Sequence, residues 1–265
     1  MLLAEFQEIM QALVPAELAE DYDNTGLLVG NPTDQISGIL IALDVSMAVQ
    51  EEALEQGCNL IVSHHPIWFK ARQNLTGSDF VARQIQFAIK NDLNLFASHT
   101  NLDNLANGVN RAIVNLLNLR HTVFLEPLGS NDSHQTPAGT GMLGELPATL
   151  SSPDFLALLQ STFGCQCIRY RSGPATIYKV AVCGGAGGFL LEKAIAAGAD
   201  ALVTGDVGYH RFWDADHQIL LADLGHYESE RFTVDVLRNL IAGHCPRIPI
   251  RIAQKSENPV QYYCP

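Results

Sequence analysis

The chain has 265 residues, of which 47% are hydrophobic and 17% charged, and this balance is typical of a globular protein and excludes wholesale disorder. Its 28 acidic and 16 basic residues give a net charge of −12, which repels phosphate backbones and disfavours nucleic-acid binding. The length suits one large domain or two smaller ones, each with a sizeable core.

The cysteine pattern and the first residues bear on the compartment. The six cysteines include no Cys-x-x-Cys pair, which fits a reducing cytoplasm better than secretion. The N-terminus carries early acidic residues such as Glu5 and no basic segment, so we expect no signal peptide. No apolar run approaches the roughly 18–20 residues that a membrane span requires. We therefore predict a soluble, cytoplasmic protein without a membrane segment.

In the first half of the chain, apolar periodicity and residues that cap or break helices predict the secondary structure. The expected elements are a helix over 2–13, a short strand within 26–30, a strand over 36–45, a helix over 46–55, a strand over 59–63, a helix over 80–90, a strand over 93–98 and a helix over 108–119. Residues 36–63 thus predict one βαβ unit with parallel strands and a right-handed connection.

Between the two halves, residues 129–144 are rich in Gly, Ser, Thr and Pro and predict a long loop or an interdomain linker. The elements expected at its end and beyond it are a strand over 142–147, a helix over 152–163, a strand over 178–183, a helix over 189–197, a strand over 201–204, a strand over 218–222 and a final helix over 228–241. Strands that alternate with helices in this way predict an α/β fold.

A shift of 141 residues, without gaps, aligns residues 38–65 with 179–206 and brings a glycine that ends a helix, Gly57, onto Gly198. We interpret this match as an internal duplication of an α/β unit. The predicted fold is therefore two related three-layer α/β domains, each with a mostly parallel sheet flanked by helices. We place the first domain at residues 1–127 plus 240–265 and the second at 128–239, with the boundary inside 127–142.

The predicted strand over 59–63 ends in two histidines, His64 and His65, and then Pro66. Proline has no amide hydrogen and pushes the preceding residue towards extended geometry, so the strand should end here. Ligands of open α/β sheets bind at the ends of strands, which makes the two imidazoles candidate metal ligands. The alternative is a histidine pair that caps the strand and bonds to nearby backbone.

Two further groups of side chains follow predicted strands. His226 and Glu230 are four residues apart at the start of a predicted helix, so both project from one face with Cβ atoms about 5–6 Å apart. Asp103 lies in a turn after the strand over 93–98. The alternatives are a helix-capping histidine with a solvated glutamate, and an aspartate that caps a helix or forms an Asx-turn. Together with His64 and His65, these side chains predict metal ligands along the edge of the sheet where the strands end.

The backbone geometry expected at His64 and His65 bears on the number of metal ions. Neighbouring side chains on an extended backbone point in opposite directions, so His64 and His65 should not chelate one ion together. Two ions, one for each imidazole, fit better and would resemble a two-metal hydrolase with ions roughly 3.5–4 Å apart. Imidazole and carboxylate ligands suit Zn, Mn, Fe, Co or Ni and do not choose among them.

Five motifs together resemble the signature of the Nif-three-like (YbgI-type) family, whose members are often labelled GTP cyclohydrolase I type II homologues. They lie at residues 23–30, 63–66, 99–103, 204–210 and 225–230. The resemblance implies a two-domain α/β subunit, a toroidal homohexamer and a dinuclear metal centre in the cleft between the domains. The residues that match the family's metal ligands are His64, His65, Asp103, His226 and Glu230, with Glu230 as the bridge.

If the family label describes the reaction, a metal-activated hydroxide would attack the purine imidazole ring of GTP, with Glu230 at the metal and His99 or His210 as proton carriers. The alternatives are that His99 only hydrogen-bonds to a ligand and that His210 is a partly buried loop residue. The glycine-rich residues 184–188 lie between a strand and a helix, where they could cradle a phosphate or simply form a tight turn.

Two classes of function therefore stay open. The first is a divalent-metal-dependent hydrolase of a small nucleotide-like or phosphorylated substrate, which includes a phosphoesterase. The second is a metal-stabilised hexameric ring with a binding or regulatory role and no catalysis.

Overall fold

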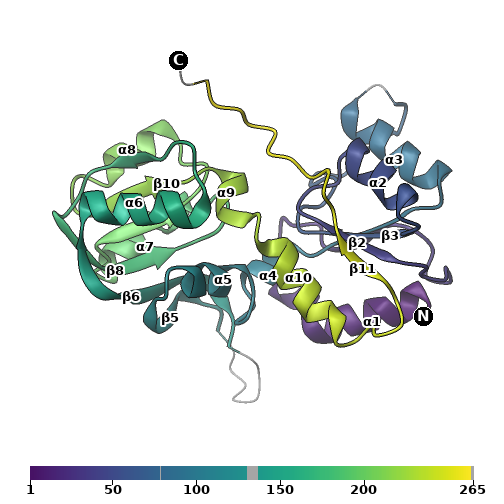
Figure 1. The fold of residues 1–265 in the computed structure, drawn as a ribbon, viewed down its shortest axis with the longest axis horizontal. Helices are drawn as coiled ribbons and strands as arrows, with labels where there is room; N and C mark the ends of the chain where they lie inside the picture. The colour runs from purple at the N-terminus through teal and green to yellow at the C-terminus, as the bar shows by residue number, and fades with distance from the viewer. Residues whose placement is uncertain (78, 130–136, 264–265) are drawn as a thin grey trace. The chain divides into compact units, whose positions relative to one another are not determined.

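The structure is a computed structural model that describes residues 1–77, 79–129 and 137–263 (Figure 1). The chain forms two compact units, which consist of Met1–Leu102 with Thr233–Glu257 and of Asp103–Phe232 with Asn258–Pro265. Among the described residues, no helix is long and apolar enough to cross a membrane.

The first unit is built on a five-stranded sheet in the order β1-β4-β3-β2-β11. Its strands are β1 (Gly26–Val29), β2 (Ile39–Ala42), β3 (Leu60–Ser63), β4 (Asn94–Ala97) and β11 (Ile250–Ile252). All neighbours are parallel except β1, which runs antiparallel to β4. The strands β2, β3 and β4 are buried on both faces, so their sequences are largely continuous apolar runs. These runs were predicted as strands.

Helices cover both faces of this sheet (Figure 1). On one face, α2 (Met47–Glu55) and α3 (Phe80–Lys90) pack against strand residues such as Leu40, Ile61 and Leu95. On the other face lie α1 (Leu3–Leu13) and α10 (Thr233–Ala242), and the ring of Phe6 in α1 contacts that of Phe96 in β4. The helix ends follow the sequence: the side chains of Ser46 and Asp79 accept backbone hydrogen bonds at the N-termini of α2 and α3.

The second unit is built on a six-stranded mixed sheet in the order β5-β6-β8-β9-β10-β7. Its strands are β5 (Arg120–Pro127), β6 (Gly139–Ser151), β7 (Arg169–Arg171), β8 (Thr176–Val182), β9 (Ala201–Thr204) and β10 (Leu220–Asp223). Only β8, β9 and β10 are parallel to one another, and the other three pairings are antiparallel. The sheet is therefore parallel in its centre and antiparallel at both edges.

This sheet is also covered on both faces. Residues of α5 (Val109–Leu116) and α6 (Ser152–Phe163) pack with Val180, Val203 and Ala222 on one face. Residues of α7 (Leu191–Ala196) pack with Ala181, Leu202 and Leu221 on the other. The predicted fold class, an α/β protein with two sheets flanked by helices, is confirmed.

The region predicted as a linker contains a strand. Residues 130–136 of that prediction lie outside the described residues, but β6 begins at Gly139 and pairs with both β5 and β8. A Cβ atom on Gly139 would lie 2.6 Å from the carbonyl oxygen of Glu126, so this glycine reflects the close approach of β5. The linker prediction was wrong for residues 139–141, because glycine there allows close contact between strands and does not mark a turn, whereas the strand predicted from residue 142 lies within β6.

The final helix is divided. The sequence predicts one helix over 228–241, whereas the structure has α9 (His226–Glu230) and α10, separated by Arg231 and Phe232. Three strands, β5, β7 and β11, were not predicted, because β7 and β11 have only three residues each and β5 lacks a regular apolar alternation.

The predicted internal duplication is supported by strand register. In the first unit Ile39 pairs with Leu60, and in the second Val180 pairs with Ala201, so both partners shift by 141 residues. Gly57 and Gly198 have φ angles of 69° and 71°, a left-handed conformation that suits glycine at the end of a helix. Antiparallel edge strands also correspond, since β1 flanks β4 and β7 flanks β10.

Candidate metal site

The first cluster of candidate ligands begins where β3 leaves the sheet. His64 is fully buried, and its Nδ1 lies 3.0 Å from the carbonyl oxygen of Ser98. Because a carbonyl oxygen only accepts hydrogen bonds, Nδ1 must carry the hydrogen, and Nε2 becomes the nitrogen with the lone pair. This is the tautomer in which Nε2 can bind a metal ion.

His65 is oriented in the same way by a carboxylate. Its Nδ1 lies 2.8 Å from Oδ1 of Asp44, which follows β2. A carboxylate that accepts from Nδ1 fixes the imidazole ring and makes Nε2 more basic, as is usual for histidines that bind metals. Asp44 lies within the strand predicted over 36–45, but the sequence did not assign it this role.

His99 completes the first cluster, because the ligand atoms of His64, His65 and His99 all lie within 4.8 Å of one another. The ring centroids of His64 and His65 are 4.9 Å apart. The expectation that these two side chains point in opposite directions is wrong, because the chain bends out of the sheet directly after β3. That argument for two ions therefore does not hold at this strand end.

A buried aspartate holds His99. Nδ1 of His99 lies 2.9 Å from Oδ1 of Asp23, whose side chain is fully buried. The other carboxylate oxygen of Asp23 accepts hydrogen bonds from the backbone N–H and the hydroxyl of Thr100. Burial alone would raise the pKa of Asp23, but the hydrogen bonds from His99 and Thr100 outweigh it and hold the pKa well below the usual range.

This pKa shift predicts how stability depends on pH. A carboxyl group whose pKa is lowered by folding stabilises the protein above its unfolded pKa of about 3.9, and this contribution is lost as the pH falls below that value. We expect Asp23→Asn to lower the melting temperature at pH 7, with a loss of about 2 kcal/mol. Thermal unfolding should show that the difference between wild type and variant shrinks from pH 5 to pH 3. A constant difference over this range would contradict the prediction.

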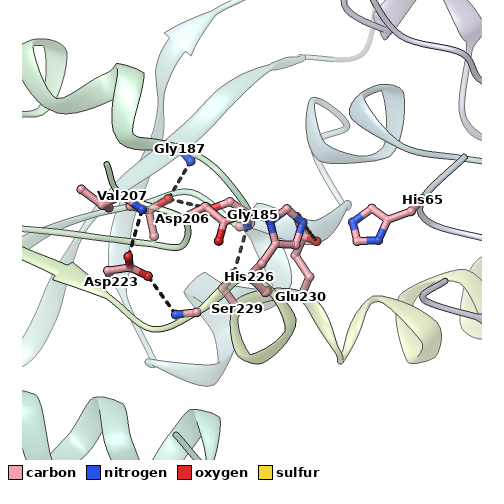
Figure 2. A network of polar contacts seen from close by, with 12 residues as sticks. His65, Gly185, Gly187, Asp206, Val207, Asp223, His226, Ser229 and Glu230 are labelled. Carbon is pink, nitrogen blue, oxygen red and sulfur yellow. Dashed lines mark hydrogen bonds and ion pairs between the residues drawn. The ribbon is translucent and has the colours of Figure 1, made fainter. Parts of the chain in front are cut away.

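The second cluster lies at the start of α9 (Figure 2). His226 and Glu230 lie on one face of this helix, and Nε2 of His226 is 3.0 Å from Oε2 of Glu230. On the other side of the ring, Nδ1 lies 2.8 Å from Oδ2 of Asp206. A carboxylate oxygen and an imidazole nitrogen lone pair repel each other, so this short contact indicates a proton or a metal ion between Nε2 and Oε2.

Two carboxylates are close together in this cluster. Glu230 is only 2% exposed, and a carboxylate oxygen of Asp103, at the end of α4 (Thr100–Asp103), lies within 4.8 Å of it. Burial raises the pKa of the nearby Cys183 thiol, and the charges of Asp103 and Glu230 raise it further. Neighbouring carboxylates in a buried position repel each other unless a cation lies beside them, so the donor set fits a divalent metal ion.

The support that Asp206 gives to His226 can be tested. In Asp206→Asn, the side-chain amide can donate to Nδ1, which would favour the tautomer with the hydrogen on Nε2 and so oppose metal binding. The backbone should tolerate the change, because Asp206 has a φ of 51° and asparagine accepts this conformation. We expect metal affinity to fall about tenfold in a competition titration, since Asp206 is partly exposed.

Asp216→Asn is the matched control for this experiment. Asp216 is also an exposed aspartate with a positive φ, of 40°, but it belongs to no cluster of candidate ligands among the described residues. Equal losses of affinity in the two variants would show that Asp206 does not act through His226.

The glycine-rich residues 184–188 form a tight turn whose amides bond within the protein. Gly184 N–H donates to Oδ1 of Asn110, Gly185 N–H to Oγ of Ser229 and Gly187 N–H to Oγ1 of Thr204. Because these three donors are already used, the turn does not offer them to a phosphate. It instead leaves room for Glu230, since a Cβ atom on Gly185 would lie 2.3 Å from Oε1 of that residue.

His210 lies apart from both clusters in the described residues. It is exposed on α8 (Tyr209–Asp214), where its ring packs against that of Tyr209 at 5.3 Å. The residues that the sequence did not assign are the acids that orient histidines, namely Asp23, Asp44 and Asp206. One signal was available for Asp206, because the 141-residue shift aligns it with His65.

The fold and these clusters define an α/β protein with a candidate metal site built from histidine, aspartate and glutamate. The chain belongs to the Duf34/NIF3 (NGG1p interacting factor 3) family, whose model matches residues 1–259, so the family predicted from the five motifs is confirmed.

Relatives in this family share most of their length with the chain. It is 32% identical over 260 residues to a "GTP cyclohydrolase 1 type 2 homolog" of Clostridium acetobutylicum, with 96% of each chain covered. It is 34% identical over 234 residues to the protein of the same name from Clostridium perfringens, with 87% of each covered. Among solved structures, Staphylococcus aureus hypothetical protein SA1388 has a TM-score of 0.90 at 27% identity, and 99% of each chain is covered. Reduced HcgD from Methanocaldococcus jannaschii has a TM-score of 0.78 at 26% identity, with 96% of this chain and 98% of that chain covered.

Proposed function

We propose that the protein is a divalent-metal-dependent hydrolase whose two metal ions are held by His64, His65, Asp103, His226 and Glu230. The observation that carries this proposal is the orientation of the histidines. A carbonyl or carboxylate oxygen lies within 3.0 Å of Nδ1 in each of the three, so Nε2 is the nitrogen directed to a ligand. Glu230, buried near Asp103 and in contact with His226, is the proposed bridge.

The metal ions would act as Lewis acids and make a nucleophile available at neutral pH. The protein would supply the proton transfer. His99 is the better-supported proton carrier, because Asp23 orients its ring and its ligand atom lies near those of His64 and His65. His210 would need to act from the exposed surface of α8, where its ring packs against that of Tyr209.

The proposed substrate is small and nucleotide-like or phosphorylated, and hydrolysis of the purine ring of GTP is the specific version. The names of the two clostridial relatives support this choice. The net charge of −12 also means that an anionic substrate would depend on bound cations to approach the site. We propose a toroidal homohexamer as the working assembly, on the strength of the family resemblance.

The test combines metal analysis with a substrate screen. The purified protein should contain Zn, Mn, Fe, Co or Ni, and chelation should abolish turnover of at least one compound in a panel of GTP, phosphomonoesters and phosphodiesters. Restoring Mn or Zn should recover it. Turnover of phosphoesters but not GTP would indicate a phosphoesterase.

The non-catalytic alternative predicts a different result. Chelation would then lower the melting temperature and the hexamer mass, while the fully loaded protein would turn over no compound. Absence of turnover by the loaded protein would overturn the proposed hydrolase.

A further inference from the structure

The second unit contains a pocket of about 360 Å³ that lies outside the clusters of candidate metal ligands. We call it the arginine–aromatic pocket, and its lining residues are Arg169, Tyr170 and Arg171 of β7 with Tyr209, Phe212 and Trp213 of α8. No part of the proposed hydrolytic function uses it.

The pocket exposes large aromatic side chains. Tyr209 is 69% exposed, Trp213 60% and Tyr170 54%. A single exposed ring is ordinary, but adjoining exposed rings that line a cavity mark a surface that binds something. Aromatic rings offer flat faces on which another planar group can stack.

Both arginines lie over aromatic rings, which orients their guanidinium groups. The Cζ atom of Arg169 is 5.6 Å from the ring centroid of Phe212, and that of Arg171 is 5.3 Å from the ring of Trp213. A guanidinium held in this way keeps its N–H groups directed outward from its edges, and these match the oxygens of a phosphate or carboxylate.

The two arginines differ in their partners. Arg169 donates to the carbonyl oxygen of Val207 at 3.1 Å and forms an ion pair with the buried Asp223. Arg171 makes no ion pair within the described part of the chain. Its Nη2 contacts Nε2 of His217 at 2.7 Å, and its Nε is buried without a hydrogen-bond partner among the described residues. In a chain of net charge −12, an arginine without an acidic partner is a site of local positive charge.

Charge and size limit the class of ligand. The cavity is large enough for one small molecule, near the lower end of the usual range of about 300–1,000 Å³. The acidic chain disfavours a polymeric anion such as nucleic acid. We propose that the arginine–aromatic pocket binds a nucleoside phosphate, with the base stacked on Tyr209 or Trp213 and the phosphate paired with Arg171. Binding needs none of the candidate metal ligands.

Calorimetric titration of the chelated full-length protein with GMP tests this proposal. We expect saturable binding of GMP, with inorganic phosphate and guanosine each at least tenfold weaker because each supplies only one of the two contacts. Arg171→Gln and Trp213→Leu should each weaken GMP binding at least tenfold. Because the titration is done without metal, its outcome is independent of whether the protein is a hydrolase.

Two substitutions outside the pocket serve as matched controls. Arg83→Gln removes an exposed arginine from α3, and Phe189→Leu removes an aromatic ring that is 57% exposed. Both should bind GMP as wild type does. The proposal is overturned if chelated wild type does not bind GMP or if the two pocket variants bind it normally. It is also overturned if those variants leave GMP binding unchanged and reduce the oligomer mass, which would identify the pocket as an interface between copies.

Discussion

Replacing Glu230 with glutamine is expected to lower metal-dependent turnover roughly 1,000-fold, equivalent to about 4 kcal/mol in the barrier. Glutamine keeps the size of the side chain but removes its charge, and its amide nitrogen cannot bind a metal ion. Because Glu230 is 2% exposed and is the proposed bridge, no solvent-exposed acid can replace it. Metal analysis of the purified variant should show a reduced metal content.

Stability of the metal-free protein distinguishes this effect from misfolding. Glu230→Gln removes one of two neighbouring carboxylates, so the chelated variant should melt at or above the temperature of chelated wild type. Glu192→Gln is the control, because Glu192 is an exposed acid that belongs to no cluster of candidate ligands among the described residues. Wild-type turnover in Glu230→Gln would show that this residue does not hold a catalytic metal.

Gly185→Ala is expected to lower metal affinity at least 100-fold. The added Cβ atom would lie 2.3 Å from Oε1 of Glu230, so that side chain would have to move, and 3.4 Å from Cε1 of His226, in van der Waals contact with the ring. A displacement of this size removes ligand atoms from the positions that a metal ion requires. The residue also has a φ of 60°, which alanine adopts only with strain of about 1–2 kcal/mol.

Gly198→Ala is the control that separates the effect of backbone strain from the effect of displacing the Glu230 side chain. Gly198 has a similar φ of 71°, but no atom lies within 4 Å of the position of its added Cβ. This variant should lose about 1 kcal/mol of stability and bind metal normally. Competition titration and thermal unfolding of both variants measure the two effects. A similar metal affinity in both variants would contradict the assigned role of Gly185.

Much of the fold could be predicted because its signals are local. The helix α3 begins after the capping Asp79, and α6 begins after the capping Ser151 and ends before Gly164, so their bounds were predicted correctly. The buried strand β3 lies between a helix-ending glycine and Pro66, which identifies it from a few residues.

The remainder depends on contacts between distant parts of the chain. The edge strand β7 has three residues and exists because it pairs with β10. Asp23 is separated from His99 by 76 residues, so no local pattern could show that it orients that ring. The candidate ligands were predicted because they follow strands, whereas the acids that orient them are determined by tertiary structure.

The shared register of the two βαβ units has a consequence for the evolution of the site. The 141-residue shift aligns His65, a candidate ligand, with Asp206, which orients His226. The same scaffold position thus carries a candidate metal ligand in one copy and an acid that orients a histidine in the other. A duplicated fold can diverge in this way because each copy has its own strand end. Mutation can alter the residues at one strand end without changing those at the corresponding end of the other copy. Specialisation of two once-equivalent strand ends would thus have produced an asymmetric set of ligands from a symmetric ancestor.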